Sequence, residues 1–344
     1  MPTHRTPPPE IKDLLHQQQR KKSAQVCLSR AHHSLRFGRM KARANATRAR
    51  SGSGAGIRDS SPSPSGPRRR KARANATRAR SGSGAGVRGS SPSPSGPRRR
   101  SNVLIAPGLL FGAKQYSGMR QHLLDLGHPR VETVPVSTMD WLPSLLLGEP
   151  FTWFLDRMEG LASELSTEGN LVSVVGHSAG GWIARIYLAP VAYNGRQYAG
   201  ERGVGSLVTL GTPHLSCEEY PFGRVKERRR GEEAEGMSEA ARGSSLVFAN
   251  EVCGLPACGV SCVAGRLAEG RGGPLARALA RASYAATCRD RDAAGDGVCP
   301  VESCLLPGRV RELVLDGVHH GPGPRNRIWY GSREVVEQWD AFLP

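Results

Sequence analysis

One short segment of this 344-residue chain has a pattern suited to nucleophilic chemistry. The segment Gly176-His177-Ser178-Ala179-Gly180 stands where an apolar run, LVSVV, gives way to the helical pattern GGWIARIYL. A sharp turn between a strand and a helix would lift the Ser178 hydroxyl out of the sheet. The helix N-terminus behind it would offer backbone N–H groups to an oxyanion. We therefore expect Ser178 to be a nucleophile.

An activated serine needs a general base, and the base needs a carboxylate that orients it. Around a turn of this kind the chain order is serine, then acid, then histidine. Asp296, within AGDGVCPVES, and His320, within LVLDGVHHGP, follow later predicted strands in that order. His319 is the alternative base, and Asp316 or Glu302 would be the alternative acid. Asp316 is so close to His320 in sequence that its side chain would reach the ring awkwardly.

An oxyanion also needs a second N–H donor, from the loop after an earlier strand. The segment PGLLFG, residues 107–112, follows a predicted strand at 102–106. We therefore expect the backbone N–H groups of Leu109 and Ala179 to form the oxyanion site together. His177, inside the turn, is interpreted as a packing residue. His214 is interpreted as structural or adjacent to substrate, because it precedes every candidate acid.

The elements that must position these residues alternate along the chain. Apolar runs predict strands at residues 102–106, 131–136, 171–175, 204–210, 260–264 and 311–315. Apolar residues spaced three and four apart predict helices at 116–126, 155–165, 182–188 and 335–343. Such alternation indicates the α/β class, with a mostly parallel sheet and helices on both faces. In such sheets the site lies at the carboxyl ends of the strands.

The basic charge of the chain is confined to its first hundred residues. The formal net charge is +18, but residues 1–100 carry a net +21 and residues 101–344 a net −3. Segment 41–70 is repeated at 71–100 with two changes, and both copies are rich in Arg, Ser, Gly and Pro. Such a composition cannot bury enough apolar surface to fold. We predict a disordered basic tail over 1–100 and a globular domain over 101–344, which excludes a basic nucleic-acid-binding globule.

The tail has three competing interpretations. Its Arg, Ser and Ala content and its scarcity of acids are typical of organelle transit peptides, which predicts a chloroplast location, with the cytoplasm as the alternative. The Arg68–Lys71 run would instead act as a nuclear signal or a phosphate-binding patch. The third interpretation is a solvated tail without a specific role. No specific nucleic-acid partner is expected, and no apolar run approaches the ~20 residues of a membrane-spanning helix. Peripheral membrane contact and the oligomeric state stay open.

Two further features lie in the predicted domain. The stretch Glu218–Arg242, within an insertion of about residues 214–245, is charge-rich and has no apolar period. It is predicted to be a solvated loop or a lid. Cys253, Cys258 and Cys262 are expected to be buried thiols, with a disulfide among them as the alternative. Their spacing differs from the paired C-x-x-C of zinc sites, and no metal or organic cofactor is implied.

Several motifs in order resemble one known superfamily. GHSAGGWIARIYL, LVTLGTPH, GDGVCPVES and LVLDGVHH together resemble the α/β hydrolases. The nearest likeness is to plant lipase-like serine hydrolases, with a more distant one to bacterial lipases and the GPI inositol-deacylase group. The resemblance covers about residues 101–343 and implies the α/β-hydrolase fold. It also implies a hydrolase of small-molecule or lipid esters, with Ser178 as nucleophile, His320 as general base and Asp296 as the orienting acid. The alternative is a catalytically silent scaffold that binds a ligand or a protein.

Overall fold

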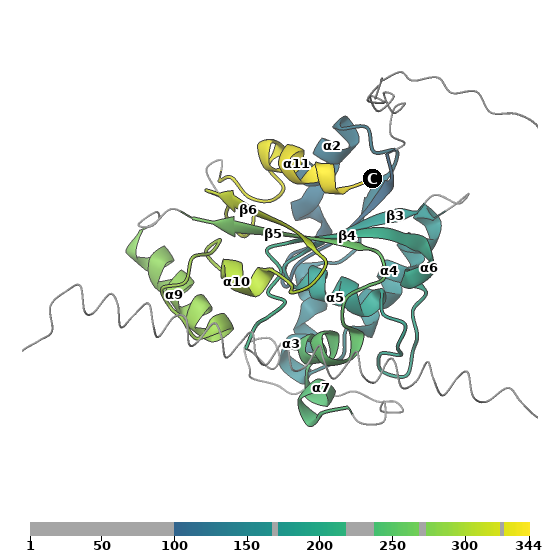
Figure 1. Ribbon diagram of the computed structural model, residues 1–344, viewed down its shortest axis with the longest axis horizontal. Helices are drawn as coiled ribbons and strands as arrows, with labels where there is room; N and C mark the ends of the chain where they lie inside the picture. The colour runs from purple at the N-terminus through teal and green to yellow at the C-terminus, as the bar shows by residue number, and fades with distance from the viewer. Residues whose placement is uncertain (1–99, 167–170, 218–236, 268–272, 324–326) are drawn as a thin grey trace, which may run out of the picture. The chain divides into compact units, whose positions relative to one another are not determined.

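The computed structural model describes residues 100–166, 171–217, 237–267, 273–323 and 327–344 (Figure 1). The predicted basic tail, with its repeats at 41–70 and 71–100, lies outside the described residues apart from Arg100. Residues 218–236 of the predicted charged stretch also lie outside them.

Six parallel strands form one sheet in the order β2-β1-β3-β4-β5-β6. This confirms the predicted parallel sheet and the approximate position of every predicted strand. The strands are β1 (Asn102–Ala106), β2 (Val131–Thr133), β3 (Val172–His177), β4 (Val204–Leu210), β5 (Gly259–Arg266) and β6 (Arg311–Asp316).

Strand β2 is shorter than predicted, because it ends at Thr133 and not at Val136. Pro135 has no N–H to donate to a strand ladder, so the strand cannot continue through it. This position is tolerated because β2 lies at the edge of the sheet.

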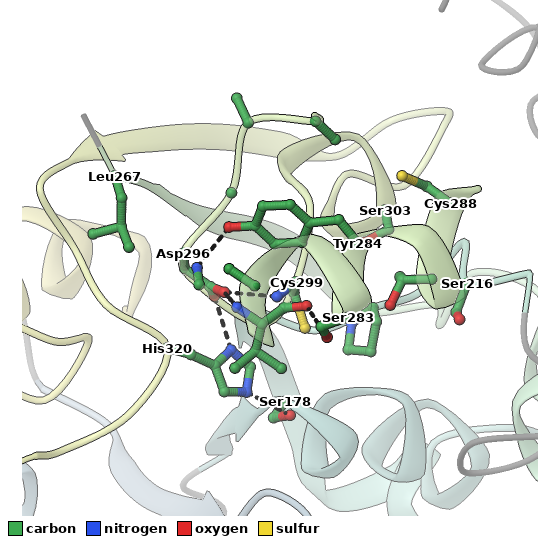
Figure 2. Close-up of a pocket in the computed structure, with 18 of the residues that line it drawn as sticks. Ser178, Ser216, Leu267, Ser283, Tyr284, Cys288, Asp296, Cys299, Ser303 and His320 are labelled. Carbon is green, nitrogen blue, oxygen red and sulfur yellow. Dashed lines mark hydrogen bonds and ion pairs between the residues drawn. The ribbon is translucent and has the colours of Figure 1, made fainter. Parts of the chain in front are cut away.

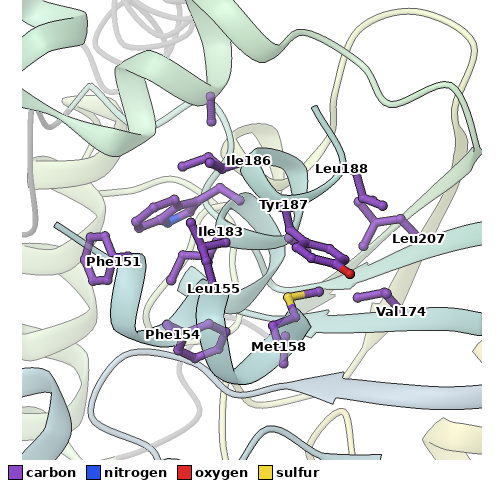
Figure 3. Close-up of a cluster of buried hydrophobic side chains, with 14 of the residues drawn as sticks. Phe151, Phe154, Leu155, Met158, Val174, Ile183, Ile186, Tyr187, Leu188 and Leu207 are labelled. Atoms are coloured by element: carbon purple, nitrogen blue, oxygen red, sulfur yellow. The ribbon is translucent and has the colours of Figure 1, made fainter. Parts of the chain in front are cut away.

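Side chains of the strands alternate between two apolar layers. In β1, Val103 and Ile105 face one layer, whereas Leu104 and Ala106 face the other, as the two-residue period of a strand requires. Helices α2 (Ser117–Asp125) and α11 (Arg333–Trp339) cover the first face, and α4 (Thr152–Leu165) and α5 (Ala179–Tyr187) cover the second (Figure 1). Figure 3 shows the second layer, where side chains of α4 and α5 pack together against the sheet. Helices on both faces confirm the predicted α/β arrangement.

Several elements were not predicted from the sequence. The longest is α9 (Pro274–Cys288), which lies in the connection between β5 and β6 (Figure 1). The short helices are α3 (Leu142–Leu147), α6 (Gly200–Gly203), α7 (Glu239–Gly243), α8 (Ser245–Phe248) and α10 (Val301–Cys304). Single turns of 3₁₀ or π-helix are η1 (Ala113–Tyr116), η2 (Thr138–Trp141), η5 (Ala249–Cys253) and η6 (Asp340–Phe342).

The three cysteines singled out from the sequence lie near the second layer. Cys262 is buried in β5, whereas Cys253 and Cys258 are half-buried against the same cluster. Burial raises the pKa of the Cys262 thiol, and it raises that of Cys258 to about 11.

Among the described helices, none is both long and apolar enough to cross a membrane.

Candidate active site

Ser178 lies at the turn between β3 and α5, where β3 ends at His177 and α5 begins at Ala179. Its backbone φ is 51°, in the left-handed region that non-glycine residues seldom adopt. The Ser178 N–H donates to the carbonyl of Leu210, at the end of β4, over 2.9 Å. Local strain of this kind is characteristic of a serine held at a sharp turn between a strand and a helix.

Two glycines allow the turn to form against its neighbours. A Cβ on Gly176 would lie 2.5 Å from the Cα of Gly181, so any side chain there would displace the start of α5. A Cβ on Gly180 would overlap the carbonyl oxygen of Ala106, at the end of β1. The glycines of the motif are therefore required by close backbone packing.

The structure brings Ser178, His320 and Asp296 together in one row (Figure 2). His320 Nε2 lies 2.9 Å from Ser178 Oγ, and His320 Nδ1 lies 2.8 Å from Asp296 Oδ2. Because a carboxylate only accepts, Nδ1 carries the proton, and Nε2 of the neutral ring is left to accept the serine proton. Asp296 is 1% exposed and His320 6% exposed, so water competes little for these bonds.

Four donors surround the carboxylate of Asp296. Besides His320 Nδ1–H, the backbone N–H groups of Val298 and Cys299 donate to Oδ1 over 3.0 and 2.7 Å, and the Tyr330 hydroxyl donates to Oδ2 over 2.8 Å. Burial alone would raise the pKa of Asp296, but the His320 ring and the backbone donors outweigh it and hold that pKa below its ordinary value. The carboxylate is thus kept ionised and fixed in direction.

The alternative residues take other positions. Asp316 is exposed and pairs with Arg266, whose Nε lies 2.7 Å from its carboxylate. Glu302 is exposed in α10. His319 is half-buried, and its backbone N–H donates to the carbonyl of Ile328. Both ring nitrogens of His320 have their partners in Ser178 and Asp296. Neither the alternative acids nor His319 therefore takes part in the row of Ser178, His320 and Asp296.

His214 was interpreted from the sequence as structural or adjacent to substrate, and its surroundings favour the structural role. It is fully buried, and its Nε2 lies 3.1 Å from the Thr209 hydroxyl. Its Nδ1 lies 3.4 Å from the guanidinium of Arg185, and burial holds the pKa of His214 well below its ordinary value.

The two predicted oxyanion donors border the same cleft as Ser178. Leu109 lies in the loop that follows β1, and Ala179 is the first residue of α5. An N–H in the first turn of a helix has no acceptor within that helix, so the Ala179 N–H is available to a ligand beside Ser178. A Cβ on Gly108 would lie 2.7 Å from the Cβ of Ser178, which shows how closely the loop passes the serine.

A broad cleft of about 2340 Å³ opens beside Ser178 and His320. One wall is α9, which contributes Ala276, Leu279, Ala280 and Tyr284 (Figure 2 shows Tyr284 beside Asp296). The sequence reasoning missed this helix. Its signals were Gly273 followed by Pro274 at the first turn and a run of the good helix formers Ala, Leu and Arg.

Asp296, Cys299 and His320 also place ligand atoms within 4.8 Å of one another. That spacing would suit a metal ion, but both carboxylate oxygens and His320 Nδ1 are already engaged in hydrogen bonds. Hydrogen bonding within the row therefore accounts for the cluster.

The strand order and the serine turn between β3 and α5 decide the fold. The chain has the α/β-hydrolase fold. In this fold the turn after this strand meets the loops that follow later strands, and here these segments bring Ser178, Asp296 and His320 together.

Comparison with solved structures gives distant matches to hydrolases. A metagenomic carboxyl esterase is 13% identical over 71% of this chain and 75% of its own, with a TM-score of 0.46. The mature Bacillus licheniformis lipase BlEst2 is 13% identical over 73% of this chain and 94% of its own, with a TM-score of 0.43. A hydrolase of the α/β superfamily from Xanthomonas campestris is 17% identical over 70% of this chain and 99% of its own, with a TM-score of 0.35. No family model and no curated protein sequence matches this chain.

Proposed function

We propose that this protein is a serine hydrolase that cleaves carboxylic esters through an acyl-enzyme intermediate. The observation that carries the proposal is the row from Ser178 Oγ through the His320 ring to the buried Asp296 carboxylate. The strained backbone of Ser178 and its position on a broad cleft support the same assignment. These features together are those that an activated serine nucleophile needs.

The reaction has two halves. In the first, Ser178 Oγ attacks the ester carbonyl carbon while His320 Nε2 takes the hydroxyl proton, and Asp296 stabilises the ring cation that forms. The N–H groups of Leu109 and Ala179 hold the tetrahedral oxyanion. His320 then gives its proton to the departing alcohol, and Ser178 stays acylated. In the second half, His320 activates a water molecule that releases the acid and restores Ser178.

The walls of the cleft favour an ester with an apolar part. Leucines from several separate segments border it, and they include Leu109, Leu215, Leu246 and Leu279. Burying a leucine-sized group in such surroundings contributes about 1.5–3 kcal/mol. We therefore propose lipid-like or small acyl esters as the substrate class.

Labelling with a fluorophosphonate probe tests the proposal directly. The full chain is expected to take up one probe, because phosphonylation requires an activated serine. Ser178→Ala should abolish labelling, and His320→Ala should slow it by roughly 10⁴- to 10⁶-fold, as removal of a triad member does elsewhere. Ser216→Ala is the matched control, since Ser216 borders the same cleft but lies outside the row.

A folded parent that takes no probe would contradict the proposal and favour the silent scaffold. Labelling that survives Ser178→Ala would show that another residue is the nucleophile. With labelling established, a series of p-nitrophenyl esters from acetate to palmitate would measure the preferred acyl length through kcat/KM.

A further inference from the structure

A chain of buried hydrogen bonds runs behind Ser178 and joins three separate parts of the sequence. The Gly108 N–H donates to the hydroxyl of Tyr116 over 2.8 Å. That hydroxyl lies 2.7 Å from His177 Nδ1, and His177 Nε2 lies 2.6 Å from the backbone carbonyl oxygen of His320. Tyr116 and His177 are both fully buried. The chain therefore connects the loop beside Ser178 to the residue that carries the base.

The direction of every proton in this chain follows from its ends. A carbonyl oxygen only accepts, so His177 Nε2 must carry its proton. Burial lowers the pKa of His177 to about 3, and the neighbouring His320 ring adds to this effect, so the His177 ring is neutral. A neutral ring that is protonated on Nε2 accepts at Nδ1. The Tyr116 hydroxyl therefore donates to Nδ1 and accepts from the Gly108 N–H.

The His177 ring is held on its other sides by aromatic contacts. Its centroid lies 4.9 Å from that of the His320 ring and between 5.4 and 5.8 Å from four further rings. These four rings belong to Phe111, Tyr116, Trp329 and Tyr330. Packed rings and two short hydrogen bonds leave His177 a single orientation, so a displacement at one end of the chain is transmitted to the other.

The two ends of the chain lie on the groups that the ester reaction uses. Gly108 precedes Leu109, the proposed oxyanion donor, so fixing the Gly108 N–H also restrains the peptide group that carries the Leu109 N–H. The carbonyl that His177 holds belongs to His320 itself, the proposed base. Both groups must be aimed at one point above Ser178 Oγ, and a misplacement of about 1 Å can reduce a rate by about 10²-fold.

We propose that His177 is a positioning residue. Through Tyr116 it holds the loop of Gly108 and Leu109, and through its own ring it holds the general base His320, in their correct positions around Ser178. This inference rests on the proposed function and assigns it a residue that packing alone would leave passive. His177 does not touch substrate in this scheme; it acts through Gly108 and His320.

Tyr116→Phe in the full chain tests the proposal, because it removes only the hydroxyl in the middle of the chain. We expect kcat for a p-nitrophenyl ester to fall by roughly 10- to 100-fold while KM changes by less than about twofold. An alkyl boronic acid, which forms a charged tetrahedral adduct with serine, should lose affinity by the same factor as kcat/KM. A role confined to packing would leave kcat per folded molecule unchanged.

Tyr193→Phe is the matched control. Tyr193 is also fully buried, and its hydroxyl accepts the backbone N–H of Phe151 over 3.0 Å, on the opposite layer of the core. Thermal unfolding of both variants measures the folded fraction. An active parent whose Tyr116→Phe form keeps its kcat, or loses no more than Tyr193→Phe, would overturn the positioning role and leave the proposed function intact.

A second measurement does not depend on ester hydrolysis. Nitrogen-15 NMR of the histidine rings, assigned with His177→Asn, should show His177 neutral and protonated on Nε2 at neutral pH. In Tyr116→Phe the Nδ1 signal should shift, because its hydrogen-bond donor is gone. A ring that is charged or protonated on Nδ1 would overturn the inferred chain. A parent that hydrolyses no ester would overturn the proposed function and the positioning role together, even if the NMR signals fit.

Discussion

The carboxylate of Asp296 has more donors than orientation of one histidine requires. Tyr330 and His320 share its Oδ2, and the Tyr330 hydroxyl in turn accepts the Gly265 N–H over 2.6 Å. Tyr330 is fully buried, so these bonds do not compete with water. The hydroxyl therefore links Asp296 to β5, and in the proposed reaction it would help to stabilise the carboxylate that faces the His320 ring cation.

Tyr330→Phe should weaken this support without changing the residues of the row. We expect kcat/KM for an ester to fall about tenfold, which corresponds to roughly 1.4 kcal/mol of transition-state stabilisation. The measurement is steady-state hydrolysis at neutral pH with the folded fraction checked by circular dichroism. Tyr198→Phe is the control. The Tyr198 hydroxyl donates to the Asp156 carboxylate over a distance of 2.9 Å, and neither residue borders the cleft. Equal losses in both variants would show that Tyr330 only contributes to packing.

At the scale of elements, the turn between β3 and α5 depends on backbone contact. A Cβ on Gly176 would meet the Cα and N of Gly181 at 2.5 and 2.8 Å, and backbone atoms cannot move aside as a flexible side chain would. Gly160 offers a contrast within α4, because a Cβ there would meet no atom within 4 Å. The same substitution therefore has opposite physical consequences at the two positions.

Gly176→Ala should lower the free energy of unfolding by about 1–3 kcal/mol, as overpacking in a dense interior does. Gly160→Ala should raise it by about 0.5–1 kcal/mol, because alanine restricts the unfolded chain and fits a helix. Urea unfolding measures both values, and fluorophosphonate labelling should slow only in Gly176→Ala. Destabilisation by Gly160→Ala would contradict the geometry given for α4, and an unchanged Gly176→Ala would contradict that of the turn.

The elements also show what the sequence could and could not predict. The runs at 102–106 and 204–210 match β1 and β4 residue for residue, because strands buried on both faces carry apolar residues at most of their positions. The order of Ser178, Asp296 and His320 was predictable because the fold restricts which loops meet at the serine. Helix α9 is exposed on all sides over its first six residues, Pro274–Leu279, and buries only Tyr284, Thr287 and Cys288, so the core requires apolar side chains only near its end.

Local sequence patterns could not predict which residues far apart in the chain would contact one another. Tyr116 and His177 are 61 residues apart, and His177 and His320 are 143 apart. The choice of His320 over His319 as the residue that contacts Ser178 likewise depends on how the loop after β6 folds, and not on residue type. The chloroplast location remains a prediction about residues outside the described part of the chain.

At the scale of the whole described domain, the first and last segments are joined by a buried charged cluster. Asp340, in η6 near the end of the chain, is 5% exposed. Its Oδ1 lies 2.8 Å from His128 Nε2, and its Oδ2 lies 2.5 Å from a guanidinium nitrogen of Arg100. The Ser101 N–H donates to the carbonyl of Pro344 over 3.1 Å. These bonds join the end of the chain, which follows α11, to the residues that directly precede β1.

Asp340 should therefore make the domain sensitive to acid. Burial alone would raise the pKa of Asp340, but hydrogen bonds from His128 and Arg100 outweigh it and hold that pKa below its ordinary value. A carboxyl group with a depressed folded-state pKa contributes stability above its unfolded value, about 3.9, and loses it as the pH falls through the folded value. The contribution should be complete at neutral pH and should disappear progressively below about pH 4.

Asp340→Asn tests this contribution by removing the charge at every pH. At pH 7 we expect the free energy of unfolding to fall by about 1.5–3 kcal/mol, the usual cost of losing a hydrogen bond to a charged group. The difference between parent and variant should narrow as the pH falls below about 4, because the parent then loses the same charge. Asp316→Asn is the control, since its pair with Arg266 is exposed and such pairs contribute about 0–1 kcal/mol. Urea unfolding at several pH values measures both variants. If the difference between parent and Asp340→Asn stayed constant down to strongly acidic pH, the Asp340 charge would not be what joins the two ends of the domain.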